Sequence, residues 1–173
     1  MSSTAKTLIS PDEYLAMTFG EREPEYVRGE VVERPMPDYV HSAIQALLVI
    51  LLAPLRPRGF RILTELRTRL AEDNYRLPDV SVFGPEQTPE LVPSAAPLVA
   101  VEIVSKDERY SVLLAKLEDY AGWGVRHIWV VDPMRRRLSV YTSDGLRDVA
   151  SLRFENIEVR IDELLRDIPA DLL

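Results

Sequence analysis

Hydrophobic positions along the chain follow either a helical or a strand-like period, and each change of period predicts a new element. Residues 38–55, DYVHSAIQALLVILLAPL, are too long and too apolar for a strand, so they predict a largely buried helix ending near Pro54. Residues 60–70, FRILTELRTRL, alternate apolar and polar side chains and predict one long strand with a polar face.

The middle of the chain predicts a buried sheet next to an amphipathic helix. RLPDVSVFG and LVAVEIV predict two strands joined by a proline-rich loop, and RHIWVVDP predicts a third. Between them, residues 107–122 predict a helix that ends at Gly122 and Gly124.

Both ends of the chain predict hairpins and short helices. A capping box, with Ser10 as N-cap and Glu13 three residues later, predicts a helix in SPDEYLAM. Hairpins are expected around Gly29 and Gly145, and IDELLRDIP predicts a C-terminal helix. This order indicates an α/β or α+β fold, with a central sheet covered by helices.

Composition narrows the class of protein and the kind of metal site. At 173 residues, with 46% hydrophobic side chains, the chain fits one compact domain, residues 1–173. No apolar run approaches the roughly 18 residues of a membrane span and no signal peptide is recognisable, so we expect a cytoplasmic protein without a membrane segment. Without cysteine, and with only His41 and His127, a metal would be held by oxygens, which suits Mg²⁺ or Mn²⁺.

The formal charge of −7 argues against a surface that binds nucleic acid everywhere, but it leaves room for a local one. Two stretches are rich in arginine, residues 51–78 and residues 135–137. Ordinary solvated arginines are the simpler interpretation of both.

Two ionisable residues occupy positions where the pattern favours a hydrocarbon. Glu102 lies at the centre of LVAVEIV, where alternation places it on one face with Ala100. Lys116 lies within the apolar stripe of the following helix, which consists of Val112, Leu113, Lys116, Leu117 and Tyr120. A salt bridge or exposure at a sheet edge could explain the glutamate, and snorkelling to water could explain the lysine.

Asp79, after Pro78 at the start of a strand, is a third ionisable group in an apolar context. A Pro-Asp pair by itself is usually a turn or strand-start feature. Two carboxylates from neighbouring strands and a lysine are nevertheless the minimum set for metal-assisted phosphodiester hydrolysis, in which the acids hold the metal.

Over nearly its whole length the chain resembles the Uma-type family of endonucleases, within the restriction-endonuclease-like PD-(D/E)XK superfamily. The resemblance rests on the order and spacing of SPDEYLAM, EYVRGEVVERP, VHSAIQALL, PDVSVF, LVAVEIVS and KLEDYAGWGVRHIWVVDP. It implies a restriction-endonuclease-like mixed sheet and a catalytic set of Asp79, Glu102 and Lys116, with Asp79 and Glu102 as metal ligands. The lysine that usually follows the second acid would fall at Val104, and its place in this family matches Lys116.

The resemblance also implies supporting roles for Glu30, His41 and Ser105, whereas Lys106 departs from the family and could supply charge near the site. Glu30 could add a metal contact or be a surface charge, His41 could cap a helix or bond in the core, and Ser105 could cap the following helix. The family usually has Pro where this chain has Lys106, and Asp where it has Val112.

Three functions follow from these features. The first is a Mg²⁺- or Mn²⁺-dependent DNA endonuclease that meets DNA through a local groove and acts as a homodimer. The second is a catalytically degenerate nuclease fold kept for dimerisation or partner binding, which Val112 and the acidic charge favour. A serine hydrolase is poorly supported, since the chain lacks a G-x-S-x-G elbow.

Overall fold

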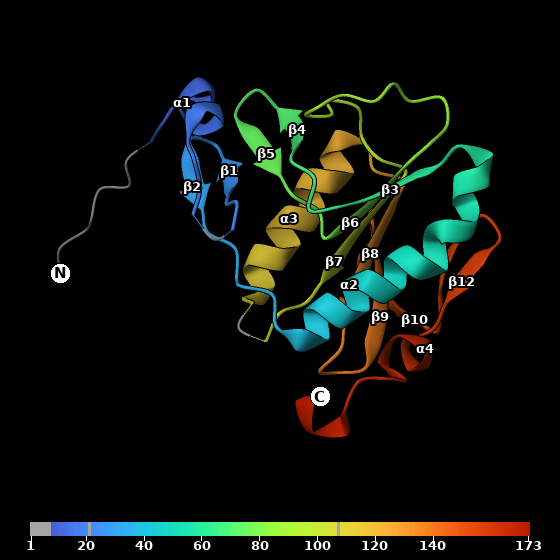
Figure 1. The fold of residues 1–173 in the computed structure, drawn as a ribbon. Coiled ribbons are helices and arrows are strands. Elements are labelled where there is room, and N and C mark those ends of the chain that lie inside the picture. Colours follow the sequence, from blue (N-terminus) through green and yellow to red (C-terminus); the bar gives the residue numbers. More distant parts are fainter. Residues whose placement is uncertain (1–7, 21, 107) are drawn as a thin grey trace.

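The computed structural model describes residues 8–20, 22–106 and 108–173, and a six-stranded mixed sheet forms its centre (Figure 1). The strand order is β10-β9-β8-β7-β6-β3. The strands are β3 (Arg61–Thr64), β6 (Val80–Phe83), β7 (Val99–Ile103), β8 (His127–Asp132), β9 (Arg137–Thr142) and β10 (Gly145–Val149). β7 and β8 pair in parallel, whereas the other neighbours pair antiparallel. This mixed sheet confirms the predicted fold class.

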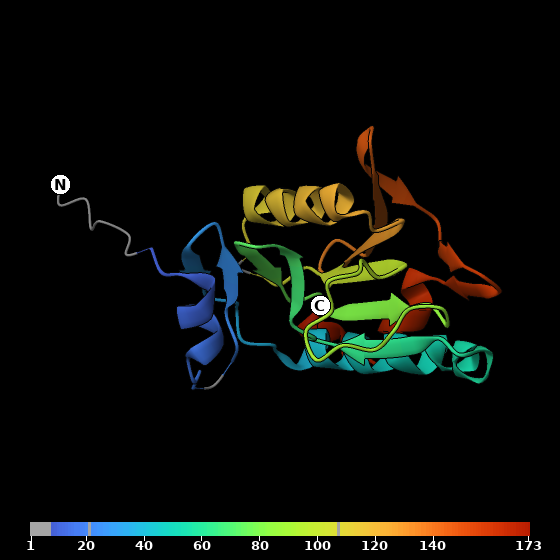
Figure 2. The ribbon, with the colours of Figure 1, turned by 90° about the horizontal axis from the view of Figure 1, so that it is seen from above.

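Helices cover both faces of the central sheet (Figure 2). On one face lies α2 (Tyr39–Leu52), which continues as the 3-10 helix η1 (Ala53–Arg58), and on the other lies α3 (Tyr110–Trp123). Along β7, Val101 packs in the core beneath α2, whereas Ala100 packs with the residues of α3. The predicted alternation of this strand is therefore confirmed, and Glu102 faces α3.

Two predictions about the helices need correction. The segment Tyr39–Arg58 is long and apolar enough to cross a membrane by length and composition, so the expectation that no run approaches that length is wrong. In the structure its inner side chains, among them Ile44 and Leu48, are buried against the central sheet. α3 begins at Tyr110 and not at residue 107, which lies outside the described residues.

A smaller four-stranded sheet, in the order β2-β1-β5-β4, lies at one end of the molecule beside α1 (Pro11–Ala16) (Figure 1). Its strands are β1 (Glu25–Val27), β2 (Glu30–Val32), β4 (Thr68–Ala71) and β5 (Asn74–Arg76). The capping box of Ser10 and Glu13 is present, and the β1–β2 hairpin turns at Arg28 and Gly29, as predicted.

The single long strand predicted for residues 60–70 is wrong, because the chain changes sheets within it. β3 belongs to the central sheet and β4 to the small sheet. The break lies at Glu65, whose φ of 49° is left-handed and whose N–H donates to the carbonyl of Pro78 at 3.1 Å. Alternation continues on both sides of the break, so the pattern contained no sign of it.

The C-terminal region adds a hairpin that the sequence did not predict. It consists of β11 (Leu152–Phe154) and β12 (Ile157–Val159), followed by α4 (Ile161–Leu165) and the 3-10 helix η2 (Ala170–Leu172). Its turn, at Glu155 and Asn156, lacks the glycine that marks the two predicted hairpins. Leu152, Phe154 and Val159 extend the core beneath α2.

Candidate active site

Asp79 and Glu102 come together where β6 and β7 pair. Val80 pairs with Val101, so extending this antiparallel register by one residue places Asp79 opposite Glu102. Both residues are buried, with 3% and 2% of their surface exposed. Together with Lys116 they line a small pocket of about 20 Å³, here called the carboxylate pocket. A space of this size holds about one water molecule or one small ion.

The carboxylate of Glu102 is bound by two side chains from α3. Oε2 accepts a hydrogen bond from Lys116 Nζ at 2.8 Å, and Oε1 accepts one from the Tyr120 hydroxyl at 2.6 Å. Lys116 is 6% exposed, which excludes snorkelling and confirms the salt-bridge alternative. Burial raises the pKa of Glu102 to about 8; Lys116 opposes this shift and the negative charge of Asp79 adds to it.

Asp79 has partners from several elements. Oδ2 accepts a hydrogen bond from the backbone N–H of Ile103 at 2.8 Å and lies 3.3 Å from His41 Nε2. Oδ1 accepts one from Arg34 Nη2 at 3.2 Å. Burial by itself would raise the pKa of Asp79, but the hydrogen bond from His41 and the charge of Lys116 bring this pKa below its ordinary value.

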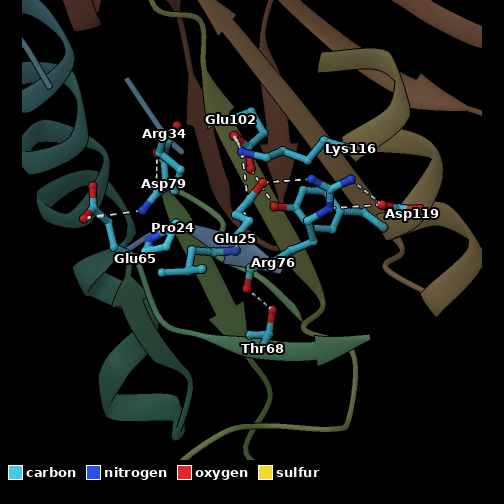
Figure 3. Close-up of polar contacts among 12 residues, drawn as sticks. Pro24, Glu25, Arg34, Glu65, Thr68, Arg76, Asp79, Glu102, Lys116 and Asp119 are labelled. Atoms are coloured by element: carbon cyan, nitrogen blue, oxygen red, sulfur yellow. Dashed lines mark hydrogen bonds and ion pairs between the residues drawn. The ribbon is translucent and has the colours of Figure 1, made fainter. Parts of the chain in front are cut away.

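A third buried acid, Glu25 at the start of β1, was missed by the sequence analysis (Figure 3). Its Oε1 lies 3.2 Å from Lys116 Nζ, and its Oε2 accepts a hydrogen bond from Arg76 Nη1 at 2.8 Å. Burial opposes ionisation, but Lys116 and Arg76 together lower the pKa of Glu25. In the sequence Glu25 opens an alternating hairpin, where an acid normally faces water, so only the packing of the small sheet reveals its role.

Arg76 links this cluster to Asp119 on α3. Its Nη2 donates to Asp119 Oδ2 at 2.5 Å, while its Nη1 donates to Glu25. The acid that the family usually carries near this helix is absent at Val112, but Asp119, two turns later, is an acid on α3 that reaches the cluster. Val112 itself is 44% exposed, so its predicted place in the core stripe is wrong and it does not line the carboxylate pocket.

Of the four residues expected to support the site, two line the carboxylate pocket and two do not. His41 and Ser105 line the carboxylate pocket, whereas Glu30 in β2 and the exposed Lys106 are not among its lining residues. His41 bonds in the core, while Asp38 caps α2 by accepting from the His41 N–H at 2.8 Å. Ser105 is not the N-cap of α3, because this helix begins five residues later.

The two arginine-rich stretches form no single basic face. Arg58 pairs with Glu155, and Arg76 is buried against acids as described above. In the second stretch, each of Arg135, Arg136 and Arg137 pairs with an aspartate. The arginines of the second stretch are exposed, as the simpler interpretation expected, whereas Arg76 of the first stretch is buried.

The carboxylate pocket offers the right donor atoms for a hard cation. Asp79 and Glu102 supply the carboxylate oxygens that Mg²⁺ and Mn²⁺ prefer, and the pocket has room for about one ion. Each of their four oxygens already accepts a hydrogen bond within the chain, from Arg34, Ile103, Tyr120 or Lys116. No group of three or more His, Asp or Glu side chains within the described residues is arranged around a common metal position. The two carboxylates therefore suit a metal ion by their chemistry. A bound ion would take the place of some of the N–H and O–H donors that these oxygens now accept from.

Comparison with known proteins gives the class and then the family. The fold matches, with a TM-score of 0.83 and 26% identity, the crystal structure of "a putative nuclease belonging to DUF820 from Anabaena variabilis ATCC 29413", over 91% of this chain and 98% of that one. The chain therefore has the fold of this putative nuclease. The family model of Uma2, described as "Putative restriction endonuclease", matches residues 11–168, and the chain belongs to this family. No curated protein matches the chain.

Proposed function

We propose that the protein is a Mg²⁺- or Mn²⁺-dependent endonuclease that hydrolyses phosphodiester bonds of DNA. The observation that carries this proposal is the buried set of Asp79, Glu102 and Lys116 around one pocket at the junction of β6 and β7. Membership of a restriction-endonuclease family, which is typically metal-dependent, supports it.

Each residue has a distinct role in this reaction. Asp79 and Glu102 would hold the metal, which when bound polarises the phosphate and activates a water molecule. In this hydrolysis the oxygen of a water molecule would form a bond to phosphorus while the bond from phosphorus to the sugar oxygen breaks. The water would give up one proton, and the sugar oxygen would take up one. Lys116, whose charge Glu102 and Glu25 stabilise, offsets the negative charge that develops on the phosphate.

A plasmid-nicking assay with Mg²⁺ and with Mn²⁺ tests this function. We expect Asp79→Asn and Glu102→Gln to lower the rate by at least about 100-fold, as loss of an electrostatic contact in a transition state typically does. Asp148→Asn, which changes an exposed carboxylate in β10, is the matched control and should keep the wild-type rate. Full nicking by both site variants would overturn the proposal.

A non-catalytic nuclease fold that binds a partner is the second candidate. The observation that favours it is the internal pairing of all four oxygens of Asp79 and Glu102, since a purely structural polar core would be satisfied in the same way. Absence of both nicking and metal binding in the wild type would favour this candidate.

We also propose where the protein acts, in which oligomeric state, and how it contacts DNA. We infer a single domain that acts in the cytoplasm as a homodimer, since two copies can cut both strands of a duplex, and that meets DNA through a local groove. Light scattering after size exclusion tests the dimer, which a monomer at assay concentration would contradict.

A further inference from the structure

The helix α2 is apolar on both of its sides. One stripe is buried against the central sheet and consists of Val40, Ile44, Leu48 and Leu52. The opposite side faces outward, and α2 forms the outermost layer on this face of the sheet (Figure 2). The sequence has no aspartate, glutamate, lysine or arginine between Asp38 and Arg56. A helix that packs one side on a sheet normally carries charged and polar residues on its other side.

The outward side of α2 carries a second apolar stripe, here called the outer stripe. Its members recur with the spacing 4-3-4-3 and are Tyr39, Ala43, Ala46, Ile50 and Ala53. Tyr39 and Ile50 are 60% and 65% exposed, Ala46 is exposed, and the other two alanines are half-buried. Alternating steps of three and four residues are the spacing with which one helix packs along another. The outer stripe therefore has the pattern of a helix contact, although no other helix covers it within the part of the chain that the structure describes.

The outer stripe is complementary in shape to a second copy of itself. When two copies cross antiparallel about a twofold axis at Ala46, Tyr39 of each copy lies near Ala53 of the other, and Ile50 lies near Ala43. Each large side chain thus meets a small one, which is how facing helices fill the space between them. At the axis Ala46 meets Ala46 of the other copy, and side chains of this size let two helices approach to about 8 Å.

The two ends of the outer stripe are complementary in charge in the same arrangement. Asp38, the N-cap of α2, is exposed, and so is Arg56 in η1, which forms no ion pair within residues 8–20, 22–106 and 108–173. Antiparallel pairing brings Asp38 of one copy towards the end of the other copy where Arg56 lies. A helix that lies on a membrane surface would instead carry several lysines and arginines on its polar side, and α2 has none. The charges therefore favour a second copy of the chain over a membrane.

We infer that α2 is the interface of a homodimer, in which the outer stripes of two copies pack antiparallel across a twofold axis. This inference rests on the proposed function, because it names the surface of the dimer proposed there. On its inner side the same helix contacts the candidate site. Gln45 Nε2 donates to the backbone carbonyl of Asp79 at 2.8 Å, and His41 Nε2 lies 3.3 Å from Asp79 Oδ2. Each carboxylate pocket therefore lies next to the interface helix, so one dimer brings together two sites for the two strands of a duplex.

Sedimentation equilibrium of charge variants at the axis tests this interface. Ala46→Glu and Ala46→Lys each place two like charges opposite one another only if Ala46 meets its own copy. Each variant alone should associate at least about 100-fold more weakly than the wild type, because juxtaposed like charges at an interface are strongly unfavourable. An equimolar mixture of the two variants should form a heterodimer, because the facing charges are then opposite. Ala115→Lys changes an exposed alanine in the middle of α3 and is the matched control, which should stay dimeric.

Dimers of both single variants, or a mixture that stays monomeric, would overturn the interface. A monomeric wild type would overturn it too, and binding of that monomer to vesicles of anionic phospholipid would show that a membrane covers α2 instead. Plasmid nicking on the same samples separates the two proposals. Nicking by a monomeric wild type overturns the interface and leaves the proposed hydrolysis standing. A wild-type dimer that the single variants dissociate and their mixture restores, without nicking in either metal, supports the interface and overturns the hydrolysis.

Discussion

Glu25 Oε1 lies 3.2 Å from Lys116 Nζ, and this contact joins the small N-terminal sheet to the helix that covers the central sheet (Figure 3). The same ammonium lies 2.8 Å from Glu102 Oε2. Burial lowers the pKa of Lys116, but Glu102 and Glu25 more than offset this effect and keep the lysine charged. Lys116, the proposed catalytic cation, is therefore held by Glu102 of the proposed site and by Glu25 from outside it.

Glu25→Gln should strongly destabilise the fold, because Lys116 and Arg76 would lose a shared buried partner. Breaking a buried ion pair from one side typically costs about 3–5 kcal/mol. Urea unfolding measures this change. Glu23→Gln, two residues away, removes a partly exposed partner of Arg67 and should cost about 0–1 kcal/mol. Equal losses for the two variants would contradict the bridging role of Glu25.

Glu25 should also make stability depend on pH on the acid side. Its pKa in the folded protein lies below the ordinary value of 4.5, so its contribution is fully present above that pH. The contribution is lost as the pH falls through the lowered pKa, because the carboxylate must then take up a proton. Thermal unfolding between pH 3 and pH 6, as a rough working range, should show a steeper decline for the wild type than for Glu25→Gln. Identical slopes would be the contrary result.

Lys116 and Glu102 should behave as a coupled pair in a double-mutant cycle. Lys116→Met leaves a buried carboxylate without its cation, whereas the double variant Lys116→Met with Glu102→Gln leaves neither charge. We expect the double variant to lose less stability than the sum of the single variants, by about 1–3 kcal/mol. Strict additivity in urea unfolding would show that the 2.8 Å contact carries no energy.

The left-handed conformation of Glu65 can be tested through its backbone. A residue with a Cβ pays roughly 1–2 kcal/mol at a positive φ, whereas glycine does not. Glu65→Gly should therefore be more stable than Glu65→Ala by about that amount, although both remove the carboxylate. Ala46→Gly, on the exposed side of α2, should instead lose about 1 kcal/mol. A more stable alanine variant at position 65 would contradict the positive φ.

The sequence predicted those parts of the fold that have a regular pattern. The alternation in LVAVEIV correctly placed Glu102 towards α3, and the capping box and hairpin turns were found at their positions. The sheet change at Glu65 was missed because period-two alternation runs unbroken through it. The β11–β12 hairpin was missed because it turns at Glu155 and Asn156, without the glycine that marks the predicted hairpins.

The candidate site was predictable only where an ionisable residue broke an apolar pattern. Glu102 and Lys116 could be recognised in this way, and the structure places them in contact. Glu25 and Arg34 lie in polar, alternating segments, where a charged side chain is ordinary. Their burial arises from the packing of the small sheet and the segment after it against the central sheet, which is a tertiary effect that a local pattern does not contain.

Isothermal titration with Mn²⁺ tests most directly whether the buried carboxylates form a metal site. We predict one bound ion per chain for the wild type and for Asp148→Asn, and no binding for Glu102→Gln or Asp79→Asn, with circular dichroism confirming that each variant is folded. Unchanged Mn²⁺ binding in Glu102→Gln and Asp79→Asn, or no binding by the wild type, would contradict the assignment of these carboxylates as metal ligands.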